Sequence, residues 1–83
     1  MHEYSLVQAM FDQIGAAVRS HGAIAVRRVR VRMGTRAGVE PALFQTAYDV
    51  FRVKTVCESA PLDIVPVPSS DELLLDQLEL EVP

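Results

Sequence analysis

Hydrophobic residues recur at steps of three and four in two parts of the chain, which is typical of amphipathic helices. The stripe nearer the N-terminus consists of Val7, Met10, Phe11, Ile14 and Val18. Ser5 and Gln8 have the spacing of a capping box, and Gly22 can close the helix, so we expect it to span about residues 6–21. Residues 1–4 are then too few for a helix, and we expect them to form a short strand.

The second helical stripe lies in the middle of the chain. It consists of Leu43, Phe44, Ala47, Tyr48 and Phe51. Pro41 suits the first turn of a helix, where its missing N–H costs nothing, and Glu40 places a negative charge at the positive helix end. We therefore expect a helix from Pro41 to about Lys54.

Between the two helices the pattern changes to strict alternation, which predicts a strand with one solvated face. The two faces carry different residues: Val29, Val31 and Met33 on one, and Arg28, Arg30 and Arg32 on the other. Ile24 and Val26 have the parity of the arginines, so the alternation slips by one position. This slip predicts either a bulge or the start of the strand near Arg27.

The last third of the chain predicts two more strands. Residues 61–68 are rich in β-formers but contain three prolines, which restricts such a strand to a sheet edge. Residues 69–71 are a turn. Residues 72–82 end in alternation, from which we expect Leu78, Leu80 and Val82 to point inward and Glu79 and Glu81 outward. The element order predicts an α+β fold, with two helices packed on one small mixed sheet.

Charge is segregated along the sequence. Residues 1–54 hold all 8 Lys and Arg with 4 acids, whereas residues 55–83 hold 7 acids and no base, which together give the net charge of −3. We therefore expect the strand with the arginine row to neighbour the C-terminal strand, so that Arg28, Arg30 and Arg32 face Glu79 and Glu81. Such exposed pairs contribute about 0.2–1 kcal/mol each, enough to select a register.

Composition excludes several classes of protein. A chain of 83 residues with 49% hydrophobic residues forms one folded domain. Its single cysteine, Cys57, excludes a disulfide framework and a cysteine-rich zinc site within these residues. The net charge argues against nucleic acid as a partner, and no membrane span or signal peptide is recognisable, so we expect a cytoplasmic protein. No catalytic motif is present, and we expect no enzyme.

The first three residues can form a metal site. A free α-amine at Met1, the backbone nitrogens that follow it and Nδ1 of His2 can close small chelate rings, and nitrogen donors in a plane suit Ni(II) or Cu(II). Glu3 would supply a backbone nitrogen or a supporting carboxylate. A polar start to the chain without metal is the alternative, favoured by roughly ten to one for so short a motif in an arbitrary protein.

Several segments together resemble the HypA/HybF family. They are MHE at residues 1–3, YSL opening the first helix, VRRVRVRMG at residues 26–34 and GVEP at residues 38–41. Family members are accessory proteins that deliver nickel to nickel–iron hydrogenase and, in some bacteria, urease. The resemblance covers nearly the whole chain and implies a metallochaperone that binds Ni(II) through Met1, His2 and Glu3. Its partner would be a hydrogenase maturation factor or the hydrogenase large subunit.

The sequence departs from the family pattern in two places. In the family, a zinc ribbon with two CxxC pairs lies between the last two strands, whereas this chain has only the turn at residues 69–71. We therefore expect one nickel-binding domain over residues 1–83, with no structural zinc. Thr35 and Arg36 also replace the residues usual after Gly34. Loss of the ribbon favours an alternative function, in which the fold serves as a metal-independent docking module, a small subunit or a homo-oligomer.

Two further residues could act as ligands, but each has a simpler interpretation. His21 falls at the predicted end of the first helix, where we expect a surface cap. Cys57 follows the second helix among apolar residues, where we expect a buried and inert thiol.

Overall fold

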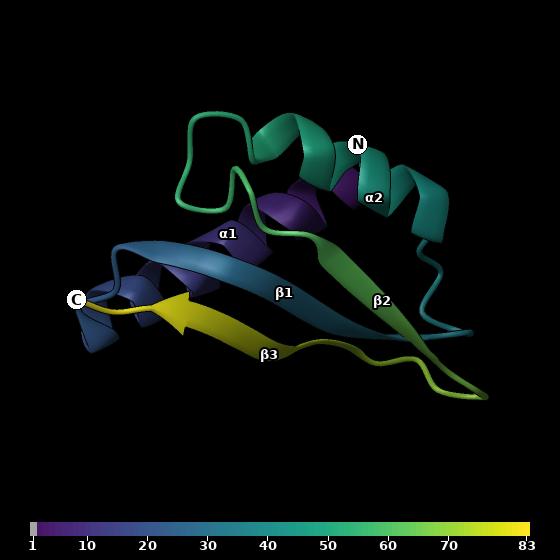
Figure 1. The fold of residues 1–83 in the computed structure, drawn as a ribbon. Helices are drawn as coiled ribbons and strands as arrows, with labels where there is room; N and C mark the ends of the chain where they lie inside the picture. Colours follow the sequence, from purple (N-terminus) through teal and green to yellow (C-terminus); the bar gives the residue numbers. More distant parts are fainter. Residues whose placement is uncertain (1) are drawn as a thin grey trace.

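Two helices cover one face of a three-stranded mixed sheet in a computed structural model that describes residues 2–83 (Figure 1). The elements in chain order are α1 (His2–His21), β1 (Ala25–Gly34), α2 (Pro41–Phe51), β2 (Leu62–Val67) and β3 (Leu73–Glu81). β1 lies in the middle, parallel to β2 and antiparallel to β3. The predicted α+β class is confirmed, as is the edge position of the proline-containing strand. Neither helix has the length and hydrophobicity needed to cross a membrane.

Helix α1 begins four residues earlier than the sequence predicted. The prediction of a strand at residues 1–4 is wrong for residues 2–4, which are helical, while Met1 lies outside the described residues. The capping-box prediction is also wrong, because Ser5 lies within the first turns of the helix rather than before it. Packing across the fold explains the longer helix: the Tyr4 ring lies 5.8 Å from the Phe51 ring, centroid to centroid. The end was predicted correctly, since Gly22 has a positive φ of 62°.

The core lies between the helices and the inner face of β1. Its fully or nearly fully buried members are Val7, Met10, Ile14, Val26, Val29, Val31, Met33, Phe44, Ala47, Tyr48, Cys57 and Ala60. Both predicted helical stripes therefore face the sheet, except that Leu43 is 51% exposed and does not belong to the core. The Tyr48 hydroxyl donates to the Ala60 carbonyl at 2.7 Å, so this buried polar group is satisfied.

Helix α2 ends at Phe51, three residues before the predicted end. Arg52 still donates its N–H to the Tyr48 carbonyl and caps the helix. Lys54 then takes a positive φ of 61°, which a continuing right-handed helix cannot contain. The following loop closes back on the sheet, where the Val56 carbonyl accepts from the Val26 N–H at 3.0 Å.

The predicted pairing of the arginine strand with the C-terminal strand is confirmed, but its register is only partly as expected. Arg28 lies opposite Glu79, with Nε and the carboxylate 3.5 Å apart. Glu81 instead contacts Arg27 at 3.1 Å, and Arg30 lies opposite Gln77. The physical reason is a pair of register shifts, of which one falls at the predicted bulge and the other lies between Arg30 and its neighbour Val31. Arg32 pairs with Glu72, just before β3, at 2.9 Å.

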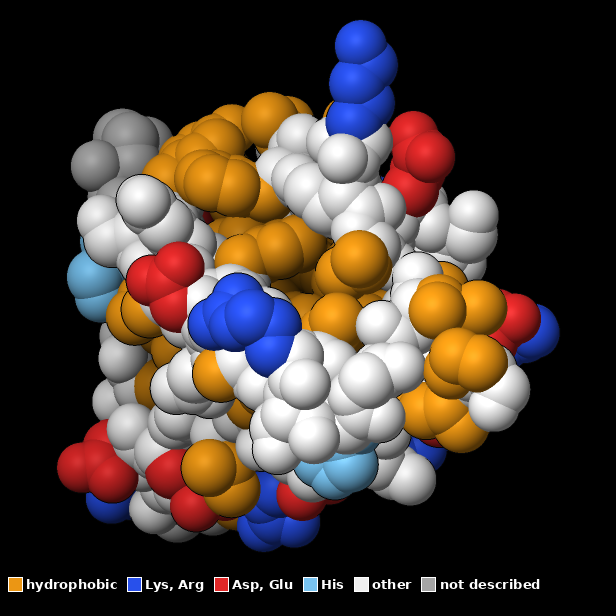
Figure 2. All heavy atoms as spheres, turned by 90° about the vertical axis from the view of Figure 1, so that its left-hand side faces the viewer, with side chains coloured by type: hydrophobic (Ala, Val, Ile, Leu, Met, Phe, Trp, Pro, Cys, Tyr) orange, Lys and Arg blue, Asp and Glu red, His pale blue; other side chains and the backbone are white. Residues whose placement is uncertain are grey.

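Hydrophobic side chains remain exposed at the end of the sheet where the chain terminates, the side of Figure 1 that faces the viewer in Figure 2. The exposed residues near this end are Ile24, Val53, Val56 and Val82. The prediction that Val82 points into the core is wrong, because β3 ends at Glu81 and Val82 is 55% exposed. Leu78 and Leu80 do pack against the core, as predicted.

Two glycines offer a matched test of the packing. A Cβ at Gly34 would overlap the backbone of Ser70, so Gly34→Ala should lower the free energy of unfolding by about 1–3 kcal/mol. A Cβ at Gly15 would meet only the flexible end of the Arg19 side chain. Gly15→Ala should therefore raise the free energy of unfolding by about 0.5–1 kcal/mol, because alanine favours a helix more than glycine does. Urea denaturation measures both. Equal effects of the two substitutions would contradict the described packing of Gly34.

Candidate metal centre

His2 and Glu3 lie together at the start of α1. The His2 side chain is 59% exposed, and its Nδ1 lies 3.8 Å from the Glu3 carboxylate. Because the first N–H groups of a helix have no intrahelical acceptor, the backbone nitrogens here take no part in the helical ladder. The predicted site also includes Met1, which lies outside the described residues. The described part of the site therefore combines an accessible imidazole with backbone nitrogens that the helix leaves unbonded.

The Glu3 carboxylate links the starts of the two helices. It accepts a hydrogen bond from the Glu40 backbone N–H at 3.3 Å, and Glu40 in turn caps α2 by accepting from the Ala42 N–H at 3.2 Å. The Glu40 N–H, together with the N–H of Glu3 itself, lowers the pKa of the Glu3 carboxyl below its ordinary value. With a side chain only 13% exposed, Glu3 holds the first turn of α1 in place.

Sequence reasoning missed the contribution of Glu40 to this site. The contact joins residues 37 positions apart, so no local pattern indicates it. The only available signal was that Glu40 precedes a predicted helix, where an N-cap residue is expected. The link between that cap and the first turn of α1 follows from the packing of the two helices, which no local sequence signal encodes.

The other two candidate ligands lie in environments that do not suit metal binding. His21 is exposed at the far end of α1, where its Nδ1 donates to the Ala17 carbonyl at 2.9 Å, so the predicted cap is confirmed. At 1.5 Å per residue it lies roughly 28 Å along the helix from His2. Cys57 is fully buried, as predicted, and burial raises the pKa of its thiol. A buried protonated thiol is unavailable to an ion at the surface.

Side chains alone do not assemble a metal site in the described residues. Within residues 2–83, no group of three or more His, Cys, Asp or Glu side chains is placed to hold an ion. His2 and Glu3 supply at most two side-chain donors. An ion held at the start of α1 would therefore need donors beyond these two side chains.

Replacement of Glu3 by glutamine tests the link between the helices. A lowered pKa means that the ionised carboxylate stabilises the fold, and this contribution is present above the unfolded pKa, near 4.5, and lost as pH falls through the lower folded value. Glu3→Gln should therefore have a lower melting temperature than the parent at neutral pH, and the difference should vanish in acid. Asp12→Asn, which removes an exposed charge from the same helix, serves as the control. A difference that persists unchanged in acid would contradict the electrostatic link.

The chain is similar to several known proteins. A family model described as "Hydrogenase/urease nickel incorporation, metallochaperone, hypA" matches residues 1–72. The hydrogenase maturation factor HypA of Shewanella baltica (strain OS185) is 41% identical over 64 residues, which cover 77% of this chain and 55% of that protein. The HypA protein of Shewanella oneidensis is 36% identical over 90 residues, which cover 100% of this chain and 76% of the relative. The chain thus spans little more than half the length of some relatives it matches.

Solved structures share the fold. The solution structure of the Ni metallochaperone HypA from Helicobacter pylori superimposes with a TM-score of 0.88 and 23% identity, and the match covers 98% of each chain. A second solution structure, of a HypA protein, gives a TM-score of 0.70 and 28% identity over 93% of this chain and 71% of that one. With the family model covering residues 1–72, the chain belongs to the HypA family of hydrogenase and urease nickel-incorporation proteins.

Proposed function

We propose that this protein is a nickel-binding accessory protein for the maturation of nickel–iron hydrogenase. Family membership supports this function, and the observation that carries the site assignment is the exposed His2 imidazole at the first residue of α1. Nickel is cargo in this proposal: it is bound by the chain and passed on, and no reaction is catalysed.

The proposed ligands are nitrogens at the beginning of the chain. The α-amine of Met1, the backbone nitrogens of His2 and Glu3, and Nδ1 of His2 are close enough in sequence to form small chelate rings. A helix that begins at His2 supports this arrangement, because its first backbone nitrogens are not engaged in helical hydrogen bonds. These nitrogens must lose protons to bind, so affinity falls as pH falls. Copper should also bind, since affinity follows the Irving–Williams order.

The Glu3 carboxylate is assigned a supporting role in this site. It already accepts from the Glu40 N–H and is largely covered, so it holds the backbone of the first turn at a fixed position. Fixing that backbone orients the His2 imidazole toward solvent without using the carboxylate as a ligand. Such supporting groups typically change metal affinity by about 10–100-fold when they are removed.

The recipient in this proposal is a hydrogenase maturation factor or the hydrogenase large subunit, and transfer takes place in the cytoplasm. Several relatives carry the name hydrogenase maturation factor, which supports this class of partner. We further propose that residues 1–83 form a single nickel-binding domain in which the turn at residues 69–71 occupies the place of the zinc ribbon. With one cysteine in the chain, and that one buried, we expect no structural zinc here.

Nickel titration by calorimetry tests the site directly. Protein with a free Met1 amine should bind one nickel ion, and His2→Ala should weaken binding by at least about tenfold because an imidazole ligand is lost. Addition of a residue before Met1 should weaken binding similarly, because it displaces the amine. His21→Ala is the matched control and should bind as the parent does, since His21 lies at the other end of α1.

The same titration separates this function from the docking-module alternative. If the parent, His2→Ala and the extended protein give the same weak heats, the chain does not carry nickel through its N-terminus, and the metal-independent module remains. Light scattering on the same samples shows whether that module is a homo-oligomer.

A further inference from the structure

Strand β3 presents an unpaired edge. The strand order is β2-β1-β3, and within residues 2–83 no strand lies beyond β3. The Glu81 carbonyl accepts from the Ile24 N–H at 2.8 Å, so the main chain of Glu81 points toward β1. Because successive residues of a strand point their N–H and C=O groups to opposite sides, Leu78 and Leu80 present theirs to the free edge. This edge offers main-chain donors and acceptors to an added strand.

The two edges of the sheet differ in their capacity to pair. β2 contains Pro66, which has no N–H, and is only 6 residues long. β3 has 9 residues and no proline. Natural sheets protect their edges with proline, short strands, β-bulges or charged side chains. β2 has the first two, whereas β3 has exposed acids and a register shift that leaves Asp76 without a partner on β1. Beyond that shift β3 is regular from Gln77 to Glu81, and an added strand would therefore pair with this regular part of β3.

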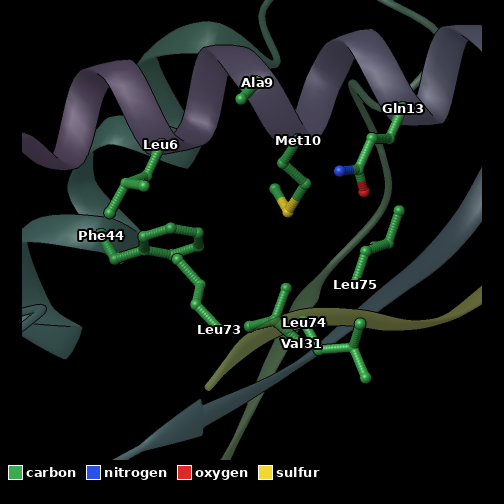
Figure 3. Close-up of a pocket in the computed structure, with 9 residues that line it drawn as sticks. All are labelled: Leu6, Ala9, Met10, Gln13, Val31, Phe44, Leu73, Leu74 and Leu75. Carbon is green, nitrogen blue, oxygen red and sulfur yellow. The ribbon is translucent and has the colours of Figure 1, made fainter. Parts of the chain in front are cut away.

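An apolar groove lies between α1 and the first three residues of β3, on the other side of Asp76 from Leu78 and Leu80 (Figure 3). Leu6, Ala9 and Gln13 line it from the helix, and Leu73 and Leu75 from the strand. Its volume is about 120 Å³, and the Phe44 ring and the Met10 side chain also line it. Side chains on the helix-facing side of an added strand would enter this groove, so that side of the strand would be apolar.

The opposite side of β3 is acidic. Glu79 and Asp76 are exposed; Glu79 lies 3.5 Å from Arg28 of β1, whereas Asp76 takes part in no salt bridge within the described residues. A second copy of β3 would bring its own acids beside these, and like charges in cross-strand positions are destabilising. The charge of the edge therefore favours a basic strand over a second copy of this chain.

We propose that the free edge of β3 binds an extended segment of another protein in which basic and apolar residues alternate. The segment adds to the sheet as a fourth strand: its main chain pairs with Leu78 and Leu80, its apolar side chains enter the groove beneath α1, and its basic side chains face Asp76 and Glu79. This mode of binding, in which a peptide extends a sheet, takes affinity from the main chain and specificity from alternate side chains. It does not depend on nickel binding by the N-terminus.

A designed peptide tests this surface. The probe is a fluorescein-labelled nine-residue peptide of alternating valine and lysine, and its binding is followed by fluorescence anisotropy. A valine–glutamate peptide should bind at least about tenfold more weakly, because like charges then meet at the edge. N-methylation of every second residue, on the edge that faces β3, should abolish binding because it removes the pairing N–H groups.

Variants and amide exchange locate the bound peptide. Asp76→Lys should weaken binding of the valine–lysine peptide by about tenfold. Glu58→Lys makes the same charge change in the loop on the β2 side of the sheet and should leave binding unchanged. The amides of Leu78 and Leu80 should gain protection from hydrogen exchange when the peptide binds, whereas those of β2 should not.

Several outcomes would overturn the proposal. They are absence of binding by the valine–lysine peptide, equal binding by the valine–glutamate peptide, and binding that survives N-methylation. Protection of the Leu78 and Leu80 amides in concentrated protein without peptide would also overturn it, because a second copy would then occupy the edge. All of these readouts are independent of nickel, so they distinguish failure of this surface from failure of the metal site.

Discussion

The position of every other element depends on the burial of one face of β1. Val29 and Val31 are almost completely buried on that face, and both helices pack over it. The arginines alternate with these valines and must therefore lie on the opposite face. There Arg28 pairs with acidic residues of both flanking strands, and Arg32 pairs with Glu72, just before β3. A single period-two pattern thus decides which side of the sheet carries the helices and which carries charge.

This arrangement has consequences at both ends of the molecule. Because both helices pack on the same face of the sheet, the first turn of α1 lies against the N-cap of α2. The Glu3 carboxylate joins the two by accepting a hydrogen bond from the Glu40 N–H. The first turn of α1 is thereby held in place while the His2 imidazole remains exposed. With β1 in the middle, β3 is an edge strand, and α1 covers it incompletely, which creates the groove beside the free edge.

Local patterns predicted most of the fold. The helical stripe that contains Val7 and Ile14 and the alternation in β1 both identified buried faces correctly, because burial of one face imposes the period directly. Local sequence patterns did not predict the features that tertiary contacts determine. Residues 2–4 have no helical period of their own and became helical against Phe51. Two register shifts placed Arg30 opposite Gln77 rather than an acid, and only one of them had a signal in the parity of the sequence.

The proposed metal site was predicted from chemistry and from resemblance, and the structure adds the contact between Glu3 and Glu40 that holds the first turn of α1. Nickel K-edge X-ray absorption spectroscopy on protein with a free Met1 amine tests the account most directly. We expect a first shell of nitrogen and oxygen donors around the nickel ion, with an imidazole contribution that disappears in His2→Ala. A sulfur donor in the first shell, or a spectrum that is the same in His2→Ala, would contradict this expectation.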